Sequence, residues 1–184
     1  MFSSTLALAT LLALDPAPRS VADAPVLSAS AGLELAGGDE LPALLEETVR
    51  LSWMPLPWLG LAGDLYLATI PEFFPWGWGV GARVGPVLRT PLGWGPASLF
   101  VTAQAGLLGL VLFGAGADGG KAGAGGPDLS AEAGIDIPLK ELDRGSNGRR
   151  GLLFLTLSGR TGTMTLDDEH LRYWSGRVAL GAGF

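Results

Sequence analysis

The chain of 184 residues is long enough for one domain, and its net charge of −6 argues against the basic face that nucleic-acid-binding proteins present. It has no cysteine, which excludes disulfides and thiolate metal sites. Charged residues make up 16% of the sequence, and soluble domains usually carry about 25%. This composition predicts an unusually apolar surface, for which a membrane is the simplest explanation.

The N-terminal residues have the features of a secretory signal peptide. The apolar run Leu6–Leu14 is too short to span a bilayer, and Ser20 and Ala22 fit the small-residue positions before a cleavage site. We therefore predict a signal peptide over residues 1–22 and a barrel domain over residues 23–184, with cleavage after Ala24 as the alternative. One departure from the pattern is that the first five residues contain no Lys or Arg.

Beyond this segment, apolar and polar side chains alternate in stretches of about ten residues, as in membrane barrels. A period of two is that of a β-strand, whose successive side chains point to opposite faces. We predict eight strands, at residues 26–36, 45–53, 58–68, 77–88, 97–110, 128–137, 151–162 and 173–184. The intervening breaks include a tight turn at 54–57, a glycine-rich loop at 113–126, a charged turn at 140–150 and a last loop at 164–170.

An even number of strands brings both ends of a barrel to the same side, which is the periplasmic side in bacterial barrels. The connections after the second, fourth and sixth strands are then expected to be periplasmic turns. The connections after the first, third, fifth and seventh strands are expected to be extracellular loops.

The polar rows of the predicted strands carry charges of both signs. An eight-stranded barrel has an interior just wide enough for side chains, and buried charges are tolerated there only when they are paired. We therefore predict a sealed, ion-paired lumen formed by Glu34, Arg50, Asp64, Arg83, Glu132, Asp136, Arg160 and Arg177.

The aromatic residues collect near the ends of the predicted strands, as in the two interfacial girdles of membrane barrels. We expect a periplasmic girdle and an extracellular girdle. The periplasmic girdle would contain Trp53, Trp58, Trp94 and Phe184. The extracellular girdle would contain Phe73, Phe74, Trp76, Trp78, Phe113 and Trp174.

The last predicted strand ends on an aromatic residue. Its apolar row contains Trp174, Val178, Leu180 and Ala182 and finishes at Phe184. This pattern resembles the closing strand of small eight-stranded bacterial outer-membrane barrels of the OmpA/OmpX type, in which a terminal Phe is the assembly signal. The resemblance implies a barrel surrounded by outer-membrane lipid and recognised by the barrel-assembly machinery through its C-terminal strand. We expect a monomer, and one departure from the family is that no length remains for a periplasmic domain. The resemblance carries over no cofactor and no catalytic residue.

Two other folds must be considered. Residues 97–117 carry no charge and are long enough for a transmembrane helix. Their glycine content and the lack of a second such span favour a strand. A soluble antiparallel barrel or sandwich would need a shared apolar core, into which the glycines and the alternating charges fit poorly.

Two motifs raise the question of chemistry. Gly114–Gly119 matches the G-x-G-x-x-G fingerprint, but the glycines that follow cannot sustain the helix that a dinucleotide site requires. Asp167–His170 gathers three carboxylates with the single histidine, which could hold a hard cation or act as a base. Charge runs in loops are usually solvated, so we assign no catalytic, cofactor-binding or metal-binding residue.

We therefore expect an all-β, non-enzymatic outer-membrane barrel with a structural or surface-interaction role. Two alternatives stay open. A lipid-modifying barrel enzyme would be favoured by a nucleophile close to His170. A narrow small-solute channel would be favoured by a lumen that is open along its axis.

Overall fold

The computed structural model describes residues 27–38, 43–70, 77–93, 96–113, 121–143, 150–166 and 169–183. These residues form eight strands, which confirms the predicted fold class. The strands are β1 (Leu27–Gly37), β2 (Leu44–Trp53), β3 (Leu59–Thr69), β4 (Gly77–Pro91), β5 (Ser98–Phe113), β6 (Lys121–Asp143), β7 (Arg150–Leu166) and β8 (Glu169–Gly183). Within the described part of the chain, no helix is long and apolar enough to cross a membrane.

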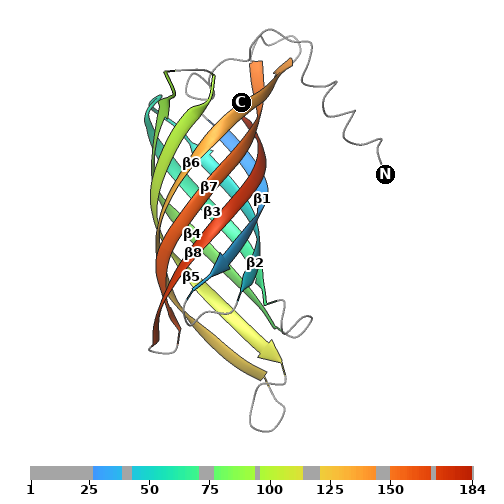
Figure 1. The fold of residues 1–184 in the computed structure, drawn as a ribbon, viewed down its shortest axis with the longest axis vertical. Coiled ribbons are helices and arrows are strands. Elements are labelled where there is room, and N and C mark those ends of the chain that lie inside the picture. The colour runs from blue at the N-terminus through green and yellow to red at the C-terminus, as the bar shows by residue number, and fades with distance from the viewer. Residues whose placement is uncertain are drawn as a thin grey trace, which may run out of the picture.

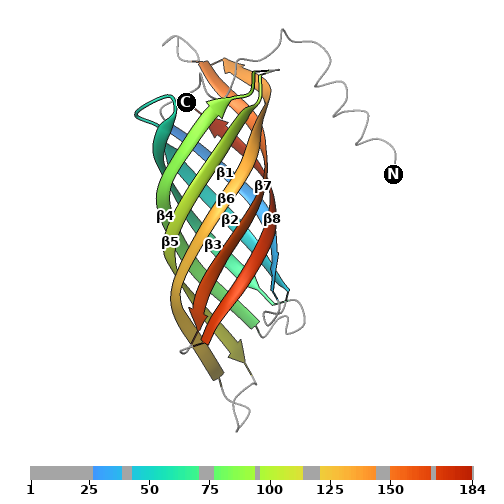
Figure 2. The same ribbon diagram turned by 60° about the vertical axis from the view of Figure 1, so that its left-hand side comes forward.

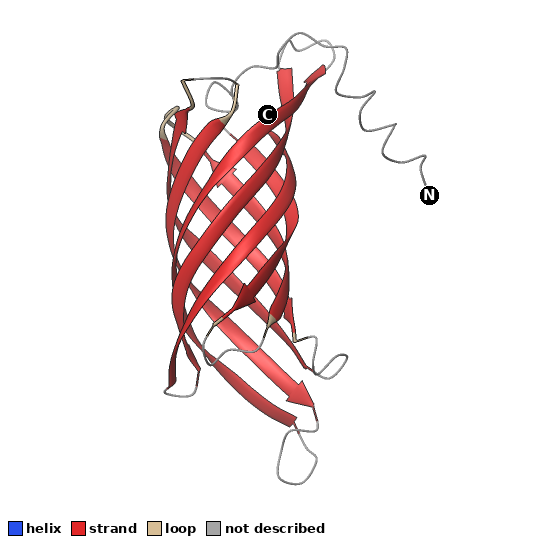
Figure 3. Ribbon diagram, in the orientation of Figure 1, coloured by secondary structure: helices blue, strands red, loops and turns tan. Residues whose placement is uncertain are grey.

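The strands close into a barrel. Each strand pairs antiparallel with the next one along the chain, and β8 pairs antiparallel with β1 (Figure 1). All strands are tilted around the barrel axis, as the turned view shows (Figure 2), and they form the whole wall (Figure 3). Every strand thus has a neighbour on both sides, and closure removes the sheet edges that an open sheet would expose.

The pairing of β1 with β8 confirms the predicted closure of the barrel. Ser28 lies opposite Gly183 at one end of this pair, and Gly37 lies opposite Trp174 at the other. Between them Glu34 lies opposite Arg177 on the inner face. The closing seam therefore places an acid beside a base.

The two ends of the barrel differ. At the proximal end β1 begins and β8 ends, and the connections β2–β3, β4–β5 and β6–β7 lie there too. The distal end carries the other four connections. There the β5–β6 hairpin projects beyond the other strands (Figures 1 and 2).

The sixth strand begins earlier than predicted. Residues 121–126, which we expected in a glycine-rich loop, belong to β6 and pair with β5 as far as Phe113 opposite Lys121. That prediction was wrong because glycine and alanine give no alternation of hydrophobicity, whereas pairing with β5 satisfies their backbone groups whatever the side chain. Residues 114–120 lie outside the described residues.

Other strands also extend further than predicted. Residues 140–143 continue β6, residues 164–166 continue β7, and β8 already begins at Glu169. The predicted charged turn and last loop were therefore too long, because polar residues at a barrel rim can stay in the ladder while their side chains meet water. The tight turn expected at 54–57 coincides with a bend over residues 55–58.

The alternative of a transmembrane helix at residues 97–117 is wrong. Most of that stretch forms β5, which pairs with β4 and β6. Its glycines take part in the sheet, with Gly106 opposite Arg83 and Gly109 opposite Val80. A long apolar run alone does not distinguish a helix from a strand. Here backbone pairing with the two neighbouring strands makes the run a strand.

The barrel is apolar outside and largely polar inside. Leu107 on the outer wall is 67% exposed, whereas Thr102 on the inner face of the same strand is 2% exposed. The period of two separates these environments along the strands. Glu47 is an exception, since it is exposed on the outer wall between Leu33 of β1 and Leu67 of β3.

Candidate functional site

The barrel interior holds all eight residues that the sequence assigned to the lumen. They are 1–7% exposed and lie on the inward rows of their strands. They are Glu34, Arg50, Asp64, Arg83, Glu132, Asp136, Arg160 and Arg177. Isolated charges at this depth would be very costly, so their partners decide whether the arrangement is stable.

Arg50 of β2 joins two acids at the centre of the interior. Its Nε and Nη2 donate to Asp64 Oδ1 and Oδ2 at 2.6 and 2.7 Å, which forms a bidentate pair with the neighbouring strand β3. Its Nη1 and Nη2 also donate to Glu132 Oε1 and Oε2 at 3.1 and 2.5 Å, on β6. Two-pronged guanidinium–carboxylate contacts are among the strong charge-assisted hydrogen bonds. Arg50 thereby links strands that are not neighbours in the wall.

Arg160 of β7 approaches the same acids from another side. Its Nη1 donates to both Glu34 carboxylate oxygens at 3.0 Å. Its Nη2 donates to Asp64 Oδ2 at 2.8 Å and to Glu132 Oε2 at 2.6 Å. Arg50 and Arg160 therefore share Asp64 and Glu132, and the central cluster is a network rather than a set of separate pairs.

Arg177 of β8 lies at the edge of the central cluster. Its Nη1 is 3.9 Å from Glu132 Oε1, and its Nη2 donates to Ser30 Oγ at 3.2 Å. Its Nε and Nη1 have no hydrogen-bond partner among the described residues. Ser158 donates a further hydrogen bond to Glu132 Oε1 at 2.7 Å. Arg177 is thus held less tightly than Arg50 and Arg160.

A second cluster lies toward the distal end, around Arg83 of β4. Its Nε donates to Asp128 Oδ2, and its Nη2 donates to the two Glu46 oxygens at 3.3 and 3.4 Å. The guanidinium carbon lies 3.9 Å from the ring centroid of Tyr66, which is a cation–π contact. The hydroxyls of Tyr66 and Tyr173 donate to Asp128 at 3.1 and 2.8 Å. These contacts satisfy the Asp128 carboxylate from three strands.

A third pair lies toward the proximal end. Arg89 Nη2 is 3.0 Å from Asp136 Oδ2, and the hydroxyl of Thr156 donates to Asp136 Oδ1 at 2.6 Å. A cavity of about 10 Å³ lies beside this pair, next to Ser52 and Phe100. That volume holds about one water molecule.

Three charged residues of these clusters are absent from the set assigned by sequence: Glu46, Arg89 and Asp128. Glu46 and Asp128 lie on the inward rows near the starts of the predicted strands 45–53 and 128–137, but they were left out of the predicted lumen set. Arg89 lies one residue beyond the predicted strand 77–88, and extending the alternation past that end would have found it. With them, the buried interior has six acids and five arginines, so the charges nearly balance.

Buried apolar side chains lie in the interior toward both ends of the barrel. The distal cluster consists of Ala36, Leu44, Tyr66, Ile70, Leu108, Leu110, Met164, Leu171 and Tyr173. At the proximal end are Met54, Ala62, Val87 and Phe100, together with the pair Leu152 and Phe154. The central charged cluster therefore lies between these apolar groups, whereas the Arg89–Asp136 pair lies among the proximal apolar residues.

Glycines make room for aromatic rings inside the barrel. A Cβ at Gly81 would meet the Tyr66 ring on the neighbouring strand, and a Cβ at Gly181 would meet the Phe154 ring. In β-sheets, an aromatic ring on one strand often covers a glycine on the neighbouring strand. The space beside these two glycines is therefore filled.

Aromatic side chains stand on the outer wall near both ends. Trp53 and Trp58 lie at the proximal end, whereas Trp78 and Trp174 lie toward the distal end. All four are between 38% and 64% exposed. Phe113 is the last residue of β5. Five more residues assigned to the girdles lie outside the described residues: Phe73, Phe74, Trp76, Trp94 and Phe184.

The predicted acidic loop supplies one contact of chemical interest. On the distal rim, Oγ1 of Thr165 lies 2.9 Å from Nδ1 of His170. Asp167 and Asp168 lie outside the described residues, as does Gly114–Gly119. Elsewhere in the described chain, no group of His, Asp and Glu is arranged to hold a metal ion.

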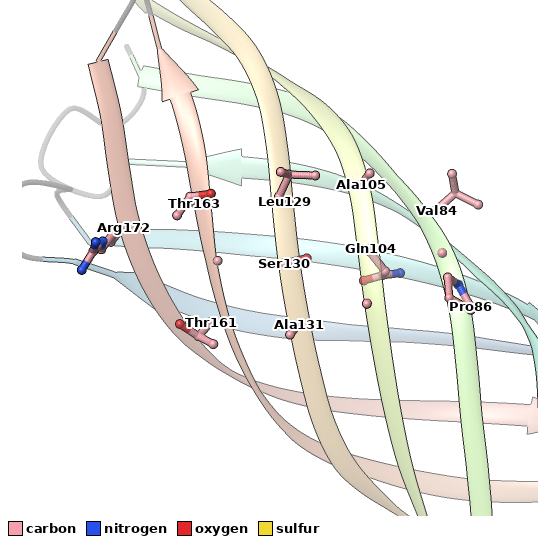
Figure 4. A pocket seen from close by; sticks show the side chains of 13 residues that line it. Val84, Pro86, Gln104, Ala105, Leu129, Ser130, Ala131, Thr161, Thr163 and Arg172 are labelled. Atoms are coloured by element: carbon pink, nitrogen blue, oxygen red, sulfur yellow. The ribbon is translucent and has the colours of Figure 1, made fainter.

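A groove of about 590 Å³ crosses the outer wall over β4 to β8 (Figure 4). Arg172 lies at one end of the groove, and Val84 and Pro86 lie at the other. Small residues form much of the surface between these ends: Ala103, Ala105, Ala131, Thr161 and Thr163. Sequence reasoning missed the groove, because its residues come together only through the register of five strands.

Comparison with solved structures gives matches to two membrane-protein structures, of which the first shows a similar fold. The crystal structure of Neisserial surface protein A (NspA) superposes with a TM-score of 0.58 at 10% sequence identity, covering 85% of this chain and 94% of that one. Ail, the attachment invasion locus protein of Yersinia pestis, gives a TM-score of 0.41 at 17% identity with the same coverage. Neither a protein-family model nor a curated protein matches the sequence. The likeness to NspA concerns the fold, which is that of the small eight-stranded outer-membrane barrels.

Proposed function

We propose that this chain spans the bacterial outer membrane and has a structural or surface-interaction role. The observation that carries the proposal is the inverted barrel, with leucines and valines outside and paired charges inside. In water, this outer wall would be an apolar patch far larger than soluble monomers expose. In a bilayer the same wall is favourable, and closure satisfies the backbone of every strand.

The proposal includes an orientation. The proximal end, to which both termini of the barrel return, faces the periplasm, and the distal end faces the outside of the cell. The β5–β6 hairpin, which projects at the distal end, is then the element most accessible to an external partner.

In the proposed role the protein neither conducts solutes nor catalyses a reaction. The central charged cluster and the apolar groups on either side of it support a sealed lumen, and we assign neither a cofactor nor a catalytic residue to it. The proposed contacts of the chain are outer-membrane lipid and the barrel-assembly machinery, which would read the C-terminal strand. We propose a monomer.

The proposal is tested with protein extracted from bacterial membranes in detergent. Folded barrel should migrate differently with and without boiling, resist protease, give a β-type circular dichroism spectrum and fractionate with the outer membrane. Protease added to intact cells should cut only at distal connections. A helical spectrum, or cleavage at proximal turns in intact cells, would contradict the proposal.

A second candidate, a lipid-modifying enzyme, is favoured by the contact between Thr165 and His170. It ranks second because, within the described residues, no acid makes a hydrogen bond to the His170 ring as in nucleophile–base–acid triads. Incubation with outer-membrane lipids followed by mass spectrometry of the acyl chains tests it. Acyl loss or transfer that disappears in Thr165→Val would establish catalysis, and unchanged lipids would dismiss it.

A further inference from the structure

The groove on the outer wall has a definite construction that the proposed function does not use. Nine of its lining residues belong to two outward rows that cross the strands in register, and the other four lie between these rows: Gly85, Gln104, Ser130 and Gly162. One row runs through Val84, Ala105, Leu129, Thr163 and Arg172 on β4 to β8. The next row runs through Pro86, Ala103, Ala131 and Thr161.

The groove is hollow because its side chains are shorter than those around it. Leu107 on β5 and Val178 on β8 are exposed on the outer wall beyond it, whereas Ala105 and Ala131 expose only a methyl group. Its volume falls in the range of about 300–1,000 Å³ that small-molecule sites occupy. A void in a lipid-facing wall is filled by lipid, because unfilled space forfeits dispersion contacts.

The groove also changes in polarity along its length. Arg172 is three residues from the distal start of β8 at Glu169, whereas Val84 is seven residues from the distal start of β4 at Gly77. The cationic end, where Arg172 is exposed beside Thr163, is therefore the distal end. The opposite end is apolar. This gradient is that of a lipid with an anionic headgroup.

The depth of the cationic end fits a headgroup. Trp174 stands two residues from Arg172 on the same outward row of β8, and indole rings mark the membrane–water interface. A guanidinium at this level binds phosphate through two parallel N–H donors. Within the described residues, Arg172 forms no ion pair that would compete with such a ligand.

We propose that the groove is a specific site for one phosphate-bearing lipid of the outer leaflet. Arg172 and Thr163 hold the phosphate, and an acyl chain lies over Ala131 and Ala105 toward Val84. This inference rests on the membrane placement proposed above and adds a ligand on the outer wall, apart from any partner of the distal hairpin.

Native mass spectrometry of the full-length barrel in detergent tests the site, with bisphosphorylated lipid A as the probe. We expect one lipid per barrel. Arg172→Gln should weaken binding by roughly tenfold or more, since a hydrogen bond to a charged group is lost. Ala131→Phe should abolish the complex by filling the groove. Matched controls on the wall outside the groove, Lys140→Gln and Ala31→Phe, should bind as the unmodified protein does.

Two further measurements test whether the site recognises both the phosphate and the lipid. Dephosphorylated lipid A should bind the unmodified protein as weakly as the phosphorylated probe binds Arg172→Gln. Inorganic phosphate at millimolar concentration should not displace the lipid, and displacement would reduce the site to a bare anion site and overturn the proposal. Equal losses in the groove and control variants would also overturn it.

The folding of each variant is checked by its mobility shift on heating. A chain that fails to insert into bilayers at all contradicts the proposed function. A chain that inserts normally but binds phosphorylated and dephosphorylated lipid alike contradicts only the lipid site.

Discussion

At the scale of single residues, the interior depends on pairing rather than on apolar packing alone. Arg160 touches Glu34, Asp64 and Glu132 and is itself 4% exposed. A buried ion pair adds little net stability compared with an apolar pair of the same shape, but removal of one partner leaves a buried charge uncompensated. The individual arginines should therefore matter far more than the number of ion pairs suggests.

Replacement of Arg160 by Met should lower the free energy of unfolding by about 3–5 kcal/mol, because three buried acids lose a shared donor. The measurement is urea-induced unfolding in lipid vesicles, followed by gel mobility and tryptophan fluorescence. Lys140→Gln, an exposed charge at the proximal end, is the control and should change stability by no more than about 0.5 kcal/mol. A loss below about 1 kcal/mol in Arg160→Met would show that water reaches the acids.

At the scale of elements, β8 completes the wall because it joins β7 on one side and β1 on the other. The β1–β8 pairing brings together residues from the two ends of the barrel sequence. We expect such long-range pairing to form late, since the chain must close its largest loop to make it.

Engineered cysteines test this closure, and the chain has no cysteine of its own to interfere. Ala31→Cys with Leu180→Cys should form a disulfide on oxidation, since these residues lie directly opposite each other. Ala31→Cys with Val178→Cys is the matched control, because Val178 pairs with Leu33 and is diagonal to Ala31. Comparable cross-linking of both pairs, read from non-reducing gels, would refute the register.

The end of β8 carries a second prediction. Phe184 lies outside the described residues, and its role as an assembly signal rests on the resemblance to outer-membrane barrels. Deletion of Phe184 should lower the amount of folded barrel in the outer membrane and leave more unfolded chain in the periplasm. Phe184→Tyr, which keeps an aromatic ring, is the control. Normal assembly of the deleted form would refute the signal.

At the scale of the whole molecule, the packing of the interior bears on whether ions can pass. Apolar residues lie on the distal and proximal sides of the central charged cluster, and eight-stranded barrels have room inside for side chains rather than for a water column. The protein is therefore expected to show no steady ion conductance in planar bilayers. A wide porin inserted in the same bilayer is the positive control, and stable unit currents from this protein would favour the channel.

Much of this architecture follows from the sequence by itself. The period of two determines which side chains face lipid and which face the lumen, so the alternation alone was enough to place residues such as Arg50 and Asp64 inside the barrel. Proline-rich and polar breaks located the turns. These are local properties, since the direction of each side chain is set by its own strand.

The tertiary structure decided everything that depends on register and on distance across the lumen. Alternation does not say that Arg160 meets Glu34, because the two residues are 126 positions apart. Residues 121–126 show no alternation of hydrophobicity, and they become a strand only because their backbone pairs with β5. The groove on the outer wall exists because short side chains on β5, β6 and β7 lie in register between Val84 of β4 and Arg172 of β8. The sequence determines which way each side chain points, whereas the closed sheet determines which side chains meet, because those contacts join strands that are far apart in the chain.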